Sequence, residues 1–108
     1  MIVSIEARKK RRLERLTASV EHIRGELSEY AHRRGGRFIL FGSVARGQHR
    51  FDSDLDIVVD FPATSEREAW FHAEKICTDH HVRPDIHLAS EASKDLMTRV
   101  SREGVVLS

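Results

Sequence analysis

The chain has 108 residues, of which 40% are hydrophobic and 32% charged, and its formal net charge at pH 7 is +1. This length supports a single core, so we expect residues 1–108 to form one domain without an added substrate domain. The apolar runs are too short to cross a bilayer, and the N-terminus lacks the apolar segment of a signal peptide. Cys77 is the only cysteine, which excludes a disulfide within the chain. We therefore expect a cytoplasmic protein.

The charge is unevenly distributed along the chain. Residues 1–37 contain ten Lys and Arg residues against five acids, whereas residues 38–108 contain eight against twelve. The basic part permits contact with RNA, a nucleotide or an acidic partner. The basic run at residues 8–12 has no interleaved aromatic residues, which favours a solvated helix start over a nucleic-acid contact.

The first third of the chain has the apolar periodicity of an amphipathic helix, with spacings of three and four residues. Its stripe consists of Leu13, Leu16, Val20, Ile23, Leu27 and Tyr30. We predict one long helix from about Ser4 to Arg34, ended by Gly35-Gly36. An apolar strand from Phe38 to Phe41 follows, and a second runs from Leu55 to Phe61 and stops at Pro62.

The remaining elements complete an α+β pattern. Residues 65–68 have the form of a capping box, which predicts a helix to about Asp79 with four inward residues. These are Ala69, Ala73, Ile76 and Cys77. The neighbouring Trp70 and Phe71 are expected in the core rather than on a base-stacking surface.

A third strand is predicted from about Val82 to Leu88, with Pro84 at a sheet edge or at the strand start. Ser90 is expected to cap a last helix through about Arg102, and the apolar tail is expected to add an edge strand or to dock on a partner. The order of elements predicts an α+β fold in which a small mixed β-sheet carries flanking helices, including the long N-terminal one.

Residues 42–56 combine features of a phosphate site and a metal site. Gly42 lets a phosphate approach the backbone, and Ser43 offers a hydroxyl and an N–H, particularly if it caps a short helix. Arg46 lies one turn later and can add a charge-assisted contact. Asp54 and Asp56 are two residues apart, so in a strand they share a face. Their mutual repulsion is relieved by a hard divalent cation such as Mg²⁺ or Mn²⁺.

The third predicted strand contributes Asp85, opposite in face to Ile86 and Leu88. Its position suits the third carboxylate that two-metal transfer sites commonly use. Other motifs fit less well. Asp52, Asp54 and Asp56 have the initial spacing of a calcium-binding loop, but the glycine and glutamate of that motif are missing, and neither a P-loop nor a dinucleotide-binding motif is present.

The remaining histidines give weaker signals. Cys77, His80, His81 and His87 lack the paired spacing of a structural zinc site. His49 fits an exposed loop residue at least as well as a nucleotide contact. The alternative interpretation of residues 42–56 is a polar hairpin turn, in which the aspartates only cap the turn and contact solvent.

Gly42-Ser43, ten intervening residues and Asp54-Leu55-Asp56 resemble the signature of the DNA polymerase beta-like nucleotidyltransferase superfamily, and residues 42–60 look most like its minimal nucleotidyltransferase (MNT) branch. The resemblance implies the nucleotidyltransferase fold and transfer of AMP from ATP to a hydroxyl acceptor. It implies that Asp54, Asp56 and Asp85 are catalytic and bind two Mg²⁺ ions, while Asp85 helps to deprotonate the hydroxyl. Gly42, Ser43 and Arg46 would hold the terminal phosphates.

The same resemblance implies a helical HEPN-domain partner, with the two proteins forming a toxin–antitoxin pair in which the antitoxin adenylylates the toxic RNase. This expectation is an analogy with the family. Two alternatives stay open. The protein could be a non-catalytic module that neutralises a partner by covering it, or a nucleotidyltransferase that acts on RNA or on a small molecule such as an antibiotic.

Overall fold

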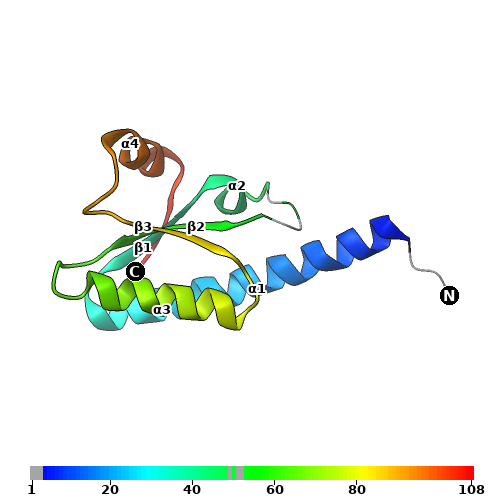
Figure 1. Ribbon diagram of the computed structural model, residues 1–108, viewed down its shortest axis with the longest axis horizontal. Coiled ribbons are helices and arrows are strands. Elements are labelled where there is room, and N and C mark those ends of the chain that lie inside the picture. Colours follow the sequence, from blue (N-terminus) through cyan, green and yellow to red (C-terminus); the bar gives the residue numbers. More distant parts are fainter. Residues whose placement is uncertain (1–3, 49, 51–52) are drawn as a thin grey trace.

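The computed structural model describes residues 4–48, 50 and 53–108, which form a four-stranded sheet with helices on both faces (Figure 1). The described elements are α1 (Ile5–Arg34), β1 (Arg37–Phe41), α2 (Gly42–Ala45), β2 (Leu55–Asp60), α3 (Glu66–Asp79), β3 (Pro84–Leu88), α4 (Lys94–Glu103) and β4 (Val105–Leu107). The α+β fold with a small mixed sheet and a long N-terminal helix is therefore confirmed. Within these residues, each helix is too short or too polar to cross a membrane.

The sheet has the strand order β3-β2-β1-β4. Strand β1 pairs antiparallel with β2 and with β4, whereas β2 and β3 run parallel. As a result, the C-terminal end of β1 lies at the same end of the sheet as the N-terminal ends of β2 and β3. Strand β4 is the edge strand that the apolar tail predicted, and Pro84 opens the other edge strand, as expected.

The helices divide the core into two layers (Figure 1). Helices α1 and α3 cover one face of the sheet, where Phe38 and Leu40 of β1 are buried. Helix α4 covers the other face, against Ile39 and Phe41. Because side chains alternate along a strand, Asp56 shares the α4 face with Val58, whereas Leu55 and Ile57 face α1 and α3.

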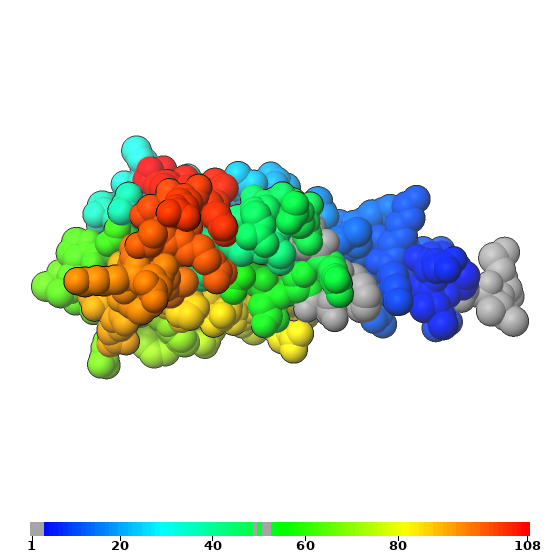
Figure 2. All heavy atoms as spheres, turned by 90° about the horizontal axis from the view of Figure 1, so that it is seen from above, coloured from blue at the N-terminus to red at the C-terminus, as the bar shows by residue number. Residues whose placement is uncertain are grey.

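Helix α1 begins and ends with favourable caps. The hydroxyl of Ser4 accepts a hydrogen bond from the Ala7 N–H at 3.1 Å, and Gly35 ends the helix with φ +76°. The buried stripe starts only at Leu16 and continues through Val20, Ile23, Leu27 and Ala31. The N-terminal part of the helix therefore extends beyond the packed body, as Figures 1 and 2 show.

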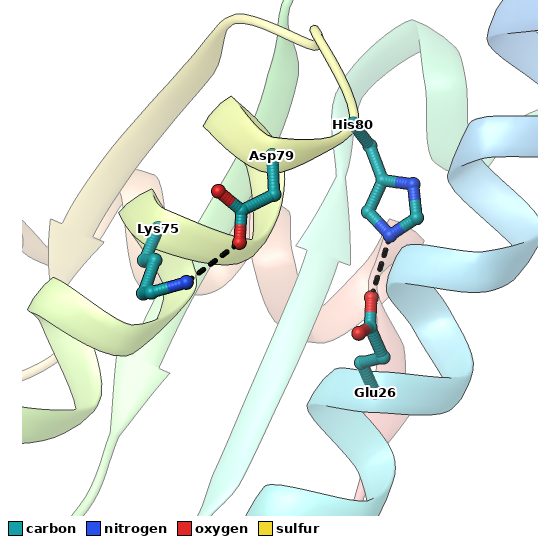
Figure 3. A network of polar contacts seen from close by, with 4 residues as sticks. All are labelled: Glu26, Lys75, Asp79 and His80. Atoms are coloured by element: carbon teal, nitrogen blue, oxygen red, sulfur yellow. Dashed lines mark hydrogen bonds and ion pairs between the residues drawn. The ribbon is translucent and has the colours of Figure 1, made fainter.

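Polar contacts attach the end of α3 to α1 (Figure 3). The His80 Nε2 lies 2.7 Å from Glu26 Oε2, and Lys75 pairs with Asp79 within α3 at 2.7 Å. The Lys75 and Asp79 side chains are exposed, so that pair adds little stability. The contact between His80 and Glu26 joins the turn that leads into β3 to α1.

Three details of the helices differ from the sequence predictions. Ser65 donates to the Pro62 carbonyl at 3.3 Å instead of capping α3. Ser93, rather than Ser90, caps α4 by accepting from the Leu96 N–H at 3.1 Å, because the helix begins at Lys94. The Ser90 hydroxyl lies in the preceding turn and donates to Glu66 at 2.9 Å.

The prediction that Phe71 lies in the core is also wrong, since its side chain is 64% exposed. Trp70 is half-buried. The inward residues of α3 are Ala69, Ala73, Ile76 and Cys77, as predicted. Phe71 follows Ala69 by two positions, about 200° around the helix, and so faces outward.

Candidate active site

The predicted site residues gather at the end of the sheet where β1 ends and β2 and β3 begin. Asp56 lies opposite Phe41 in β1 and opposite Asp85 in β3. In a parallel pair, residues in register project from the same face on strands about 5 Å apart. The crossover through α3 thus brings Asp56 and Asp85 together, although they are distant in sequence.

Gly42 is required by the space next to Asp56. Its φ is +77°, a backbone conformation that other residues adopt with strain. A Cβ built on Gly42 would overlap the Asp56 Oδ2 atom. The missing side chain therefore makes room for a carboxylate, in addition to any access that it gives to a phosphate.

The Asp56 carboxyl is electrostatically strained. Burial raises its pKa above the ordinary value, and the charge of Asp85, a hydrogen bond with Asp85 and the charge of Asp54 raise it further, while His87 opposes the shift. His87 Nε2 lies 3.4 Å from Asp85 Oδ1. Asp56 and Asp85 thus form a pair of adjacent carboxyl groups whose repulsion a bound cation would relieve.

Asp54 lies just before β2 rather than within it. Its Oδ1 accepts from Arg83 Nε at 3.1 Å, and both side chains are at least half exposed. Asp54 is therefore paired with the guanidinium group of Arg83, the residue just before β3. The expectation that both aspartates lie in one strand is wrong for Asp54, because β-pairing begins at Leu55.

The predicted phosphate-binding residues lie on and after the short helix α2. Ser43 is half-buried in the first turn and not at the N-cap, which is Phe41. Arg46 is exposed, and its guanidinium donates to Glu103 Oε2 of α4 at 3.0 Å. Gly42 is therefore adjacent to Asp56 in space, whereas the Arg46 side chain turns toward α4.

The structure adds contacts around Phe41 that the sequence did not predict. Arg99 of α4 lies over the Phe41 ring at 5.6 Å, and its Nε is 3.9 Å from the Glu103 carboxylate that Arg46 also contacts. The His87 ring is 5.9 Å from Phe41 on the same face. The sequence carried no signal for these contacts, because they depend on where α4 packs.

The chemistry of the donors fits a hard divalent cation at Asp56 and Asp85. Both supply carboxylate oxygens, and a cation would relieve the repulsion that raises the Asp56 pKa. However, the described ranges 4–48, 50 and 53–108 contain no group of three or more His, Cys, Asp or Glu side chains arranged to hold a metal ion. Asp54 can join the pair only if its carboxylate leaves Arg83.

Among the described residues, Cys77, His80 and His81 do not assemble a zinc site. Cys77 is buried, and burial raises the pKa of its thiol to about 12, which disfavours the thiolate that binds zinc. His80 is engaged with Glu26 and stacks on His22. His49 and Asp52 lie outside the described residues.

Comparisons with known proteins agree with this geometry. The sequence model of the "Nucleotidyltransferase domain" family matches residues 20–107. Comparison with the curated proteins gives no match. Among solved structures, the chain is similar to a protein provisionally described as a minimal nucleotidyltransferase, with 28% identity and a TM-score of 0.63 over 82% of this chain and 93% of the other.

Two further structures are described as toxin–antitoxin assemblies. One was solved with AMP-PNP and shares 25% identity, with a TM-score of 0.53 over 68% of this chain and 60% of the other. The second is a mutant of the pair MntA–HpeT, with 20% identity and a TM-score of 0.64 over 79% and 72%. At that identity the second likeness concerns the fold alone.

Proposed function

Because the chain belongs to the nucleotidyltransferase domain family, we propose that it is a Mg²⁺-dependent nucleotidyltransferase that transfers AMP from ATP to a hydroxyl of a partner protein in the cytoplasm. The observation that supports this most directly is the carboxyl pair of Asp56 and Asp85 against the backbone of Gly42. Carboxylates that repel one another beside a glycine turn suit a site for a cation and a polyphosphate.

In this proposal Asp54, Asp56 and Asp85 hold Mg²⁺. When bound, the ion would neutralise phosphate charge and polarise the phosphoryl group. Gly42 and Ser43 bind the terminal phosphates through the backbone and the hydroxyl. Arg46 would join them by exchanging Glu103 for a phosphate oxygen.

Asp85 is the proposed base. It accepts the proton of the acceptor hydroxyl, whose oxygen attacks the α-phosphorus. The bond from that phosphorus to the bridging oxygen then breaks, and pyrophosphate leaves. His87, at 3.4 Å from Asp85, is placed to orient that carboxylate. Positioning and electrostatic stabilisation supply most of the acceleration in such transfers.

The acceptor is the less constrained half of the proposal. The similar assembly that was solved with AMP-PNP is described as a toxin–antitoxin, which supports ATP as the donor and a protein as the acceptor. The MNT resemblance further suggests a helical HEPN-domain toxin as that acceptor, with this chain as the antitoxin.

The test combines this chain with the protein encoded by the neighbouring gene and with labelled ATP, with and without Mg²⁺. We expect label on the partner and a mass increase of about 329 Da per AMP, a covalent change that intact-mass spectrometry detects. Asp85→Asn should lower the transfer rate by at least about 10²-fold, the effect of losing a general base.

The matched control is Asp60→Asn. Asp60 lies on β2 at the other end of the strand, where it pairs with Arg37 at 2.6 Å. It should retain the wild-type transfer rate. If Asp85→Asn transfers AMP as fast as Asp60→Asn, the catalytic assignment is wrong. A stable complex without added mass would favour the covering module, and elongation of RNA or modification of a free drug would favour a different acceptor.

A further inference from the structure

The N-terminal part of α1 forms an arm, which we define as residues 5–15. It precedes the first buried residue, Leu16, and extends past α2 and the start of β2 (Figures 1 and 2). Six of its residues are Lys or Arg and two are Glu, and every one of these charged residues is exposed. At 1.5 Å per residue the arm is about 16 Å long, which makes it densely positive.

The arm also carries apolar side chains that the body does not cover. Ile5 is 70% exposed and Leu13 is 37% exposed. Leu13 precedes Leu16 by three residues and follows Ile5 by eight, so these side chains continue the buried stripe of α1 outward. Nucleic acid would engage the cations alone, whereas exposed aliphatic side chains beside them are what a protein partner buries.

A groove of about 560 Å³ lies at the base of the arm. Arg12, Arg15 and Ser19 of α1 line one side, and His80 and His81 of the turn between α3 and β3 line the other. The contact between His80 and Glu26 joins this turn to α1 (Figure 3). The groove therefore continues the surface of the arm from Arg12 and Arg15 to His81.

The groove lies close to the candidate active site. Val82 lines it, and the next residue, Arg83, pairs with Asp54 at 3.1 Å. Strand β3 then brings Asp85 beside Asp56. A partner seated on the arm and the groove would thus lie at the end of the sheet where the three aspartates are found, and it would reach Asp56 and Asp85 around that end, because their side chains project from the face opposite α1.

We propose that the arm and the groove are the docking surface for an acidic face, apolar at its centre, on the protein that carries the acceptor hydroxyl. This inference rests on the proposed function, since it assigns the acceptor's position. The cations select the charge of the partner and steer its approach, while Ile5 and Leu13 supply the apolar contact.

The test measures binding without ATP, by fluorescence anisotropy at about 0.15 M salt. The probe is a labelled helical peptide of about 20 residues, with leucines along one face and glutamates elsewhere. A single-stranded RNA of similar length is the comparison. We expect the peptide to bind, and binding to weaken as salt is raised.

Two triple variants separate position from total charge. Arg8→Gln, Lys10→Gln and Arg11→Gln together lower the net charge of the arm from +4 to +1, and Gln preserves the helix. The matched control combines Arg67→Gln, Lys94→Gln and Arg102→Gln, which removes the same charge from other exposed sites. The arm variant should bind the peptide about tenfold more weakly, and the control should bind it within about twofold of wild type.

Ile5→Gln identifies the class of partner. It should weaken the peptide several-fold, because a protein partner buries that side chain, and should leave any RNA binding unchanged. The proposal is overturned if wild type does not bind the peptide or if both triple variants bind it equally. It is also overturned if RNA binds more tightly than the peptide, or if wild type forms a dimer in sedimentation that the arm variant loses. None of these results depends on whether AMP is transferred.

Discussion

Replacing Gly42 by alanine tests whether the glycine turn shapes the carboxyl pair. The added Cβ has two consequences. It places a side chain at φ +77°, where alanine is strained, and it overlaps the Asp56 Oδ2 atom, so the carboxyl must rotate away from Gly42. Only the second consequence touches the candidate active site.

Gly35→Ala is a matched control for the first consequence. Gly35 has φ +76°, and a Cβ built there meets no atom within 4 Å. We expect a loss of about 1–2 kcal/mol in the free energy of unfolding from the left-handed backbone alone. This variant should keep its affinity for ATP and its transfer rate.

Gly42→Ala should lose the same free energy plus the cost of an off-rotamer Asp56 side chain, about 0.5–1.5 kcal/mol. Its transfer rate should fall by about 10²-fold, as expected when a reacting group is misplaced by about 1 Å.

The measurements are urea unfolding of both variants and initial rates of AMP transfer. The difference between their unfolding free energies, and the ratio of their transfer rates, remove the backbone contribution that the two variants share. If Gly42→Ala and Gly35→Ala have equal stability and equal activity, then the contact between Gly42 and Asp56 has no role in the site, and the reasoning fails.

Two further predictions concern titratable groups. The raised pKa of Asp56 means that the folded chain holds this proton to higher pH than the unfolded chain, so the carboxyl costs stability from about pH 4 upward. Asp56→Asn should therefore abolish transfer. In a chelator at pH 7 it should also unfold at a higher temperature than wild type, with little difference between the two at pH 3. A lower melting temperature at pH 7 would contradict this. Cys77 should react with a thiol reagent at pH 8 at least about 10²-fold more slowly in the folded protein than in denaturant, because it is buried with a thiol pKa of about 12; equal rates would show that Cys77 is accessible.

The sequence predicted most of the elements because their apolar periods are regular. The stripe of α1 and the inward face of α3 follow from spacings of three and four, and the observed burial agrees. The sequence was less informative about which of two nearby serines caps a helix. Ser90 and Ser93 both precede an apolar stripe. In the structure Ser90 lies in the turn after β3 and contacts Glu66 of α3, and Ser93 is the cap.

The same division applies to the candidate site. The residue types and spacing of Gly42, Ser43, Asp54 and Asp56 were enough to predict phosphate and metal chemistry and to suggest the family. The sequence could not show that Gly42 makes room for the Asp56 carboxyl, because its φ and the direction of Asp56 arise from the antiparallel pairing of β1 with β2.

By itself, the sequence determined the helices, the apolar strands and the chemical character of the residues at the turn, since these depend on near neighbours in the chain. Tertiary structure alone decided which charges meet. Parallel pairing of β2 with β3 sets Asp85 beside Asp56, and it brings Arg83 to Asp54. Electrostatic interactions depend on distances of a few ångströms in space, and these distances cannot be derived from how far apart the paired residues lie in the sequence.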